Sequence, residues 1–99
     1  MVSFSAAPYF TKEPEFQNKA EEETAIFECA ASGLPIPEIK WIYNGKPISE
    51  APYNPRRKVT PNSIIIEKLE KKDSGNYGCN ATNTHGYVYK DVYVNVLRK

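Results

Sequence analysis

The sequence predicts an all-β protein folded as one antiparallel β-sandwich, and three observations lead to this fold class. Turn-forming residues divide the 99 residues into short segments, most of which alternate apolar with polar side chains. Eight prolines interrupt the chain, and no apolar pattern with the period of a helix continues beyond one turn. Two cysteines, Cys29 and Cys79, are widely spaced, and the single tryptophan, Trp41, lies between them.

Length and composition limit what the chain can do. Its 99 residues give room for one domain with one core, and 25% charged with 40% hydrophobic residues is ordinary for a globular protein. The formal net charge is +1 and basic residues alternate with acidic ones, so no nucleic-acid partner is expected. No apolar run approaches the roughly 18 residues that a membrane span requires, so no direct membrane insertion is expected.

The domain is expected to cover residues 8–97. Residues 1–7 are interpreted as an N-terminal linker with a cloning start at Met1, and residues 98–99 as a C-terminal tail. The first five residues are too few and too uncharged for a signal peptide. A secretion signal or a membrane anchor is therefore expected outside this chain.

Alternation and turn signals predict seven or eight short strands. Asn44-Gly45 is a strong tight-turn signal between two of them. Near the middle of the chain, Ile64, Ile66 and Leu69 are expected to be buried and Ile65 to be exposed. Strands are expected over residues 24–31, 39–43, 46–48, 56–60, 63–69, 74–84 and 87–96.

The two cysteines predict one disulfide bond. An even count at wide spacing, with no Cys-x-x-Cys and no close Cys–His pair, indicates a disulfide rather than zinc, and hence an oxidising compartment. Closing a loop of this size stabilises the folded state by about 4 kcal/mol through loop entropy. The alternative is a pair of buried free thiols in a cytosolic domain. No cofactor and no metal site is expected.

The spacing of four residues resembles that of an immunoglobulin domain. Cys29, Trp41 and Cys79 are placed like the two strand cysteines and the intervening tryptophan of that fold, in which the indole packs against an inter-sheet disulfide. Tyr77 precedes Cys79 by two residues, where a tyrosine corner belongs. The resemblance implies an immunoglobulin-like Greek-key sandwich.

Two further residues complete the expected core signature. Leu69 is one, and Asp73, which stands four residues before Tyr77, is the other. In immunoglobulin domains an aspartate at this place usually pairs with a base at the start of an earlier strand. The candidates are the three bases of the run Arg56-Arg57-Lys58, and the sequence does not choose among them.

The subtype resembles the intermediate, or I-set, class. Gly33-Leu34-Pro35-Ile36-Pro37 matches the Gly-x-Pro-x-Pro entry to its strand C, and residues 79–86 match its Cys-x-Ala-x-Asn-x-x-Gly pattern. Beyond the subtype, the chain resembles the L1 family of neural cell-adhesion molecules, in particular the fourth immunoglobulin domain of its insect members. The stretches that carry this resemblance are residues 8–12, 44–48, 54–57 and 75–96.

The L1 resemblance implies a role in adhesion. In that family the first four immunoglobulin domains fold back into a horseshoe that mediates homophilic adhesion between cells. The chain is then an extracellular module of a type I cell-surface receptor, monomeric alone, with sibling immunoglobulin domains of the same or an apposed chain as homophilic or heterophilic partners. The alternatives are a secreted immune-recognition protein of the hemolin kind and a structural I-set domain of an intracellular sarcomeric array.

One N-glycosylation sequon, Asn80-Ala81-Thr82, is present. Because Asn80 follows the inward-facing Cys79, its side chain is expected to point outward on the sheet that carries strands C, F and G. A glycan there would shield that face. The alternative is a chance tripeptide that carries no glycan.

The pattern of the last strand predicts a second group of outward-facing residues on the same face. Three tyrosines lie opposite in phase to the valines at 92, 94 and 96, and are expected to form an outward interface row: Tyr87, Tyr89 and Tyr93. The alternative is that tyrosines simply favour strands and pack along one another. A glycan at Asn80 would crowd this row, so the two predictions compete.

No catalytic constellation is recognisable in the sequence. His85 is the only histidine, both cysteines are assigned to the disulfide, and there is no glycine-rich phosphate loop. The basic run at 56–58 is interpreted as a solvated edge rather than a site for sulfated polysaccharide, and Glu21-Glu22-Glu23 as an exposed turn rather than a calcium site. The sequence therefore predicts a binding module and not an enzyme.

Overall fold

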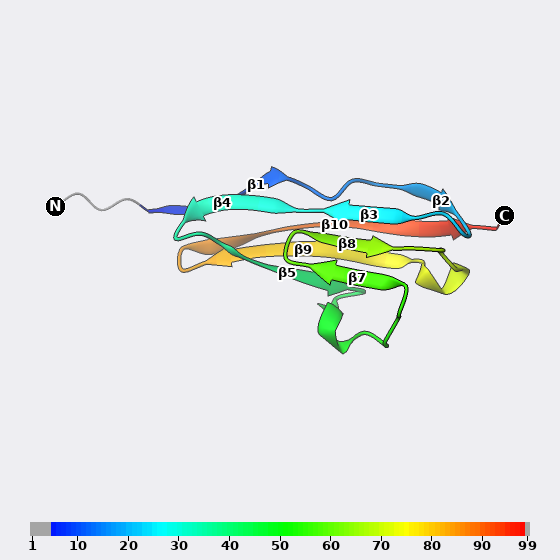
Figure 1. Ribbon diagram of the computed structural model, residues 1–99. Helices are drawn as coiled ribbons and strands as arrows, with labels where there is room; N and C mark the ends of the chain where they lie inside the picture. Colours follow the sequence, from blue (N-terminus) through cyan, green and yellow to red (C-terminus); the bar gives the residue numbers. More distant parts are fainter. Residues whose placement is uncertain (1–4, 99) are drawn as a thin grey trace.

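Two layers of β-strands pack face to face (Figure 1). The computed structural model describes residues 5–98. One layer is a sheet of order β2-β10-β9-β5-β6. The other layer holds the pair β1-β4 and the trio β3-β8-β7, and β3 and β4 are successive parts of one strand line interrupted at Cys29 (Figure 1).

Most elements are short, as the spacing of turn signals predicts, and β10 with 12 residues is the longest of those described. The first layer consists of β2 (Asn18–Ala20), β10 (Gly86–Leu97), β9 (Gly75–Asn83), β5 (Glu38–Tyr43) and β6 (Lys46–Pro47). The second consists of β1 (Ala6–Lys12), β4 (Ala30–Leu34), β3 (Ala25–Glu28), β8 (Ser63–Ile66) and β7 (Arg57–Thr60). Two 3-10 turns, η1 (Ile48–Glu50) and η2 (Lys71–Asp73), lie in connections.

The chain passes between the layers after β1, β2, β4, β6 and β8, and the last three crossings give Greek-key connectivity. Neighbouring strands are antiparallel, except that β2 and β10 run parallel. The predicted all-β, immunoglobulin-like sandwich is confirmed.

The core lies between the layers and receives side chains from both. Burial alternates along β3, where Ala25 and Phe27 point inward and Ile26 points outward. In β8, Ile64 and Ile66 are fully buried, while Ile65 is half-exposed. The buried cluster comprises Ala25, Phe27, Cys29, Trp41, Ile64, Ile66, Leu69, Tyr77, Cys79, Val94 and Val96.

The turn between β5 and β6 follows the sequence signal. Asn44 and Gly45 have φ angles of 50° and 83°, as a type I′ hairpin turn requires. Tyr43 and Lys46 are the strand partners that close it. This predicted turn is confirmed.

Two strands have no counterpart among the predicted ones. These are β1 and β2, and β1 begins at Ala6, inside the segment interpreted as a linker. The pairing of β1 with β4 shifts register between Ala6 and Tyr9, and both strands pair with partners far along the chain, so no local pattern marks them. Residues 1–4 and 99, which belong to the predicted linker and tail, lie outside the described residues.

Some boundaries also differ from the predicted ones. The segment 24–31 is divided at Cys29 and continues to Leu34. The segment 63–69 is a strand only to Ile66, because Lys68 takes a positive φ of 50° that ends the extended run.

Candidate functional site

The disulfide between Cys29 and Cys79 joins the two layers. The Cα atoms of the two residues are 6.5 Å apart, and both side chains are buried. Residues 5–98 contain no free cysteine. The predicted inter-sheet disulfide is confirmed.

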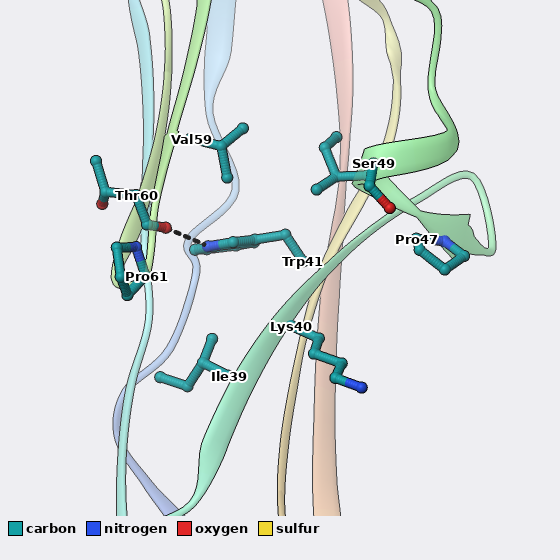
Figure 2. A pocket seen from close by; sticks show the side chains of 9 residues that line it. Ile39, Lys40, Trp41, Pro47, Ser49, Val59, Thr60 and Pro61 are labelled. Atoms are coloured by element: carbon teal, nitrogen blue, oxygen red, sulfur yellow. Dashed lines mark hydrogen bonds between the residues drawn. The ribbon is translucent and has the colours of Figure 1, made fainter.

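Trp41 lies beside this disulfide and spans the gap between the layers. It is the strand partner of Cys79 and only 4% of its surface is exposed. Its indole Nε1 donates a hydrogen bond of 3.2 Å to the carbonyl oxygen of Thr60 in β7 (Figure 2). A groove opens here at the edge between β5 and β7, with Ile39 and Val59 beside the ring (Figure 2). The indole therefore packs between the sheets and also bonds to the far one.

Tyr77 forms the tyrosine corner. Its hydroxyl donates a 2.6 Å hydrogen bond to the carbonyl oxygen of Asp73, four residues earlier. Its ring stacks on Phe27 with centroids 4.9 Å apart. Burial raises the pKa of the Tyr77 hydroxyl, so this group remains a protonated donor at neutral pH.

Arg56 is the base that pairs with Asp73. Its Nη1 and Nη2 donate to the two carboxylate oxygens at 2.6 and 3.1 Å, a bidentate arrangement. The backbone N–H of Glu70 and the amide of Asn54 donate to the same carboxylate at 2.8 and 3.0 Å. Asp73 is 5% exposed, so its charge is buried but fully hydrogen-bonded.

The other two bases of the run have partners of their own. Arg57 Nη2 donates to the carbonyl oxygen of Pro52 at 3.0 Å. Lys58 Nζ lies 3.5 Å from a carboxylate oxygen of Glu67. Each base at 56–58 thus has a neighbour within the chain, which favours a structural edge over a free cationic surface.

Lowering the pH is expected to weaken the fold through Asp73. Burial favours the neutral carboxyl, but the hydrogen bonds from Arg56, Glu70 and Asn54 outweigh it, so the pKa of Asp73 lies below its ordinary value. A depressed pKa stabilises the fold above the unfolded value of about 3.9, and this stabilisation is lost as the pH falls through the folded pKa. Urea unfolding at a series of pH values measures this loss.

Asp73→Asn is the matched variant for this measurement. It is less stable than the wild type at neutral pH, because Arg56 loses its anionic partner. The difference in unfolding free energy between the two proteins is expected to narrow as the pH falls from about 4 through the lower folded pKa of Asp73, because in this range the unfolded wild-type chain binds a proton that the folded chain does not. A difference that stayed constant down to pH 2 would contradict this role of Asp73.

The outer face of the β2-β10-β9-β5-β6 sheet carries the remaining predicted residues. The register places Lys40, Asn80 and Tyr89 side by side across β5, β9 and β10. Tyr87 and Tyr93 flank Tyr89 along β10, and the exposed fractions of Tyr87, Tyr89 and Tyr93 are 68%, 42% and 56%. The tyrosine row and the sequon asparagine therefore lie on one face, with Tyr89 directly beside Asn80.

Sequence reasoning missed the contact between Tyr89 and Gly78. A Cβ atom added to Gly78 would come within 2.7 Å of Tyr89 Cζ, so the phenol ring lies directly over this glycine. Burial, followed by the neighbouring Asp91 carboxylate, raises the pKa of the Tyr89 hydroxyl. Gly78 and Tyr89 lie diagonally across from each other on the neighbouring strands β9 and β10. A glycine placed diagonally from an aromatic residue is the sequence pattern that could have predicted this contact.

Sequence reasoning also missed a clamp at the end of the sandwich where β1 begins. The Asn83 amide nitrogen donates to the carbonyl oxygens of Ala6 and Pro35, both at 2.9 Å. Its oxygen accepts a 2.8 Å bond from the backbone N–H of His85. Asn83 thereby ties β1, the β4–β5 loop and the β9–β10 turn together, and His85 has a backbone role in that turn.

Between residues 5 and 98, no three His, Cys, Asp or Glu side chains gather as metal ligands would. In the same span, no helix has the length and apolarity to cross a membrane.

A disulfide under a buried tryptophan, a tyrosine corner and an arginine–aspartate pair between two Greek-key layers define an immunoglobulin-like domain. Residues 8–96 match the family model described as "Immunoglobulin I-set domain", and the chain belongs to this family.

Comparisons with known proteins agree with this assignment. The chain is 59% identical to neuroglian of Drosophila melanogaster over 96 residues, covering 97% of this chain and 7% of neuroglian. It is 38% identical to neural cell adhesion molecule L1.1 of Danio rerio, covering 97% and 8% of the two chains. A solved structure also superposes on the chain, with a TM-score of 0.87 at 26% identity, and covers 98% of this chain and 100% of its own. It is a chimeric titin Z1Z2 functionalized with a KLER exogenous peptide from decorin.

The predicted resemblance to the L1 family is thus confirmed. The chain spans less than a tenth of the length of these two curated relatives.

Proposed function

We propose that the chain is an extracellular module of a cell-adhesion receptor and contributes to homophilic or heterophilic recognition between proteins. The observation that carries this proposal is the 59% identity to neuroglian across 97% of the chain. The buried disulfide supports it, because such bonds persist in the oxidising environment outside the cell.

The shape of the domain suits an end-to-end array of sibling domains. β1 begins at one end of the sandwich and β10 ends at the other (Figure 1). Recognition then involves neighbouring domains, and the isolated chain is a monomer at micromolar concentration. Sedimentation velocity checks this, and a tight dimer of the isolated chain would contradict the need for neighbouring domains.

A domain exchange tests the adhesive role directly. The matching immunoglobulin domain of Drosophila neuroglian is replaced by this chain, and the hybrid is displayed on non-adherent cells. We expect such cells to aggregate as well as cells that display unaltered neuroglian, because the chain carries the surfaces that its siblings contact. Aggregate size, measured by light scattering at equal surface display, is the readout.

A matched control separates recognition from spacing. In the control hybrid the same domain is replaced by an I-set domain of titin, which has the same fold at 26% identity. Antibody staining of unpermeabilised cells confirms that both hybrids reach the surface. Equal aggregation by the titin hybrid would show that the domain is only a spacer, and failure of this chain's hybrid to aggregate would remove the adhesive role.

A further inference from the structure

We propose that Asn80 carries an N-linked glycan whose first sugar packs against the ring of Tyr89 and covers the outer face of the β9–β10 hairpin. This inference goes beyond the adhesive function and does not depend on it. It rests on the sequon, on the direction of the Asn80 side chain and on the placement of the rings beside it.

The Asn80 side chain has the outward direction and the free amide that an attached sugar requires. It lies between the inward-facing Cys79 and Ala81, so its own side chain points to the outer face, where it is half-buried. Its side-chain amide makes no hydrogen bond to any residue in the described part of the chain. Thr82, the hydroxyl residue of the sequon, points to the same face.

The neighbours of Asn80 form a platform that fits a sugar ring. Tyr89 is the direct strand partner of Asn80, and Tyr87 is the partner of Thr82. Strand partners stand about 5 Å apart, within reach of the first sugar. Lys40, the partner of Asn80 on β5, closes the other side with an exposed ammonium group.

Gly78 explains where the Tyr89 ring lies. Because Gly78 has no side chain, the Tyr89 ring leans along β10 and covers this glycine, so that Cζ would stand 2.7 Å from an added Cβ. The ring therefore lies over Gly78, the outward-facing position next to Asn80 along β9. It stays 42% exposed, so one face of an aromatic ring remains available beside the free amide.

The chemistry of the two groups is complementary. A pyranose ring presents a face of C–H groups, and an aromatic ring carries a negative face that attracts such groups. Three exposed tyrosines on one sheet form an apolar surface of the kind that soluble proteins cover. A glycan at Asn80 covers the part of this surface that Tyr87 and Tyr89 form, without a protein partner.

The attachment is a group transfer that uses a lipid-linked diphosphate oligosaccharide as donor. The amide nitrogen of Asn80 attacks the anomeric carbon, a C–N bond forms, and the C–O bond to the diphosphate breaks. The lipid diphosphate leaves with the electron pair, and the amide loses one proton. Transfer precedes folding, because in the folded sheet Asn80 lies between β5 and β10.

This arrangement removes the competition between the sequon and the tyrosine row. Tyr87 and Tyr89 then contact the glycan and not another protein. Recognition would use other surfaces, such as the outer face of the opposite layer.

The first test is the intact mass of the chain secreted from insect cells, before and after an amidase that removes N-glycans. We expect a glycan on the wild type and on Thr82→Ser, which keeps the sequon, and none on Asn80→Gln or Thr82→Val. An unmodified wild-type chain from this glycosylating host would overturn the proposal.

The second test asks whether the first sugar packs against the Tyr89 ring. The melting temperature of the secreted, glycosylated chain is compared with that of the same chain from bacterial periplasm, which has the disulfide but no glycan. We expect the glycan to raise the melting temperature by about 4 °C in the wild type and in Tyr93→Ala, and to have no effect in Tyr89→Ala. Tyr93 is the matched control because it lies opposite Asn76, away from the sequon. An equal rise of the melting temperature in Tyr89→Ala would contradict the packing of the sugar against the Tyr89 ring.

Discussion

Replacing Trp41 by alanine is expected to lower the free energy of unfolding by about 3–5 kcal/mol. The indole is 4% exposed and belongs to the buried cluster, so truncation leaves a cavity between the layers. The carbonyl oxygen of Thr60 also loses its indole donor. Urea unfolding followed by circular dichroism measures the change.

Two variants control this experiment. Trp41→Phe keeps part of the ring volume but loses the hydrogen bond to Thr60, and is expected to cost less than alanine. Tyr87→Ala removes a ring that is 68% exposed and is expected to change stability by no more than about 0.5 kcal/mol. A loss at Tyr87 as large as at Trp41 would show that the assigned phase of β10 is wrong.

Removing the disulfide is expected to cost about 4 kcal/mol. The bond closes a loop with a sequence separation of 50, so without it the unfolded chain gains much conformational freedom. Urea unfolding of the double variant Cys29→Ala, Cys79→Ala against the wild type under non-reducing conditions measures this loss. In a domain this small, the loss is a large part of the total stability.

Reduction provides the control for the double variant. A reducing agent should lower the stability of the wild type by a similar amount and leave the double variant unchanged. The intact mass of the wild type should also increase by two hydrogens on reduction. Equal masses before and after reduction would contradict the bond and favour a domain of a cytosolic array.

The centre of the fold was predictable from the sequence because its residues follow rules of spacing. Cys29, Trp41 and Cys79 each face inward from a strand whose alternation is visible locally. Tyr77 stands two residues before a cysteine, so the same alternation points it inward. The inward direction of these side chains can therefore be predicted without knowing how the loops fold.

The remaining features depend on contacts that no local pattern carries. The choice of Arg56 over its two basic neighbours depends on how the loop after η1 approaches η2. The partners of Asn83 are 77 and 48 residues away, although the asparagine itself belongs to the I-set pattern. Gly78 meets Tyr89 only because β9 and β10 share one register.

The parallel pairing of β2 with β10 determines how the domain responds to tension. Asn18, Lys19 and Ala20 lie beside Asn95, Val96 and Leu97. A pull at the start of β1 and the end of β10 drags these two strands in opposite directions along their length. Their backbone hydrogen bonds are then sheared together instead of being opened one after another. The domain would thus resist stretching most strongly along the line joining its ends.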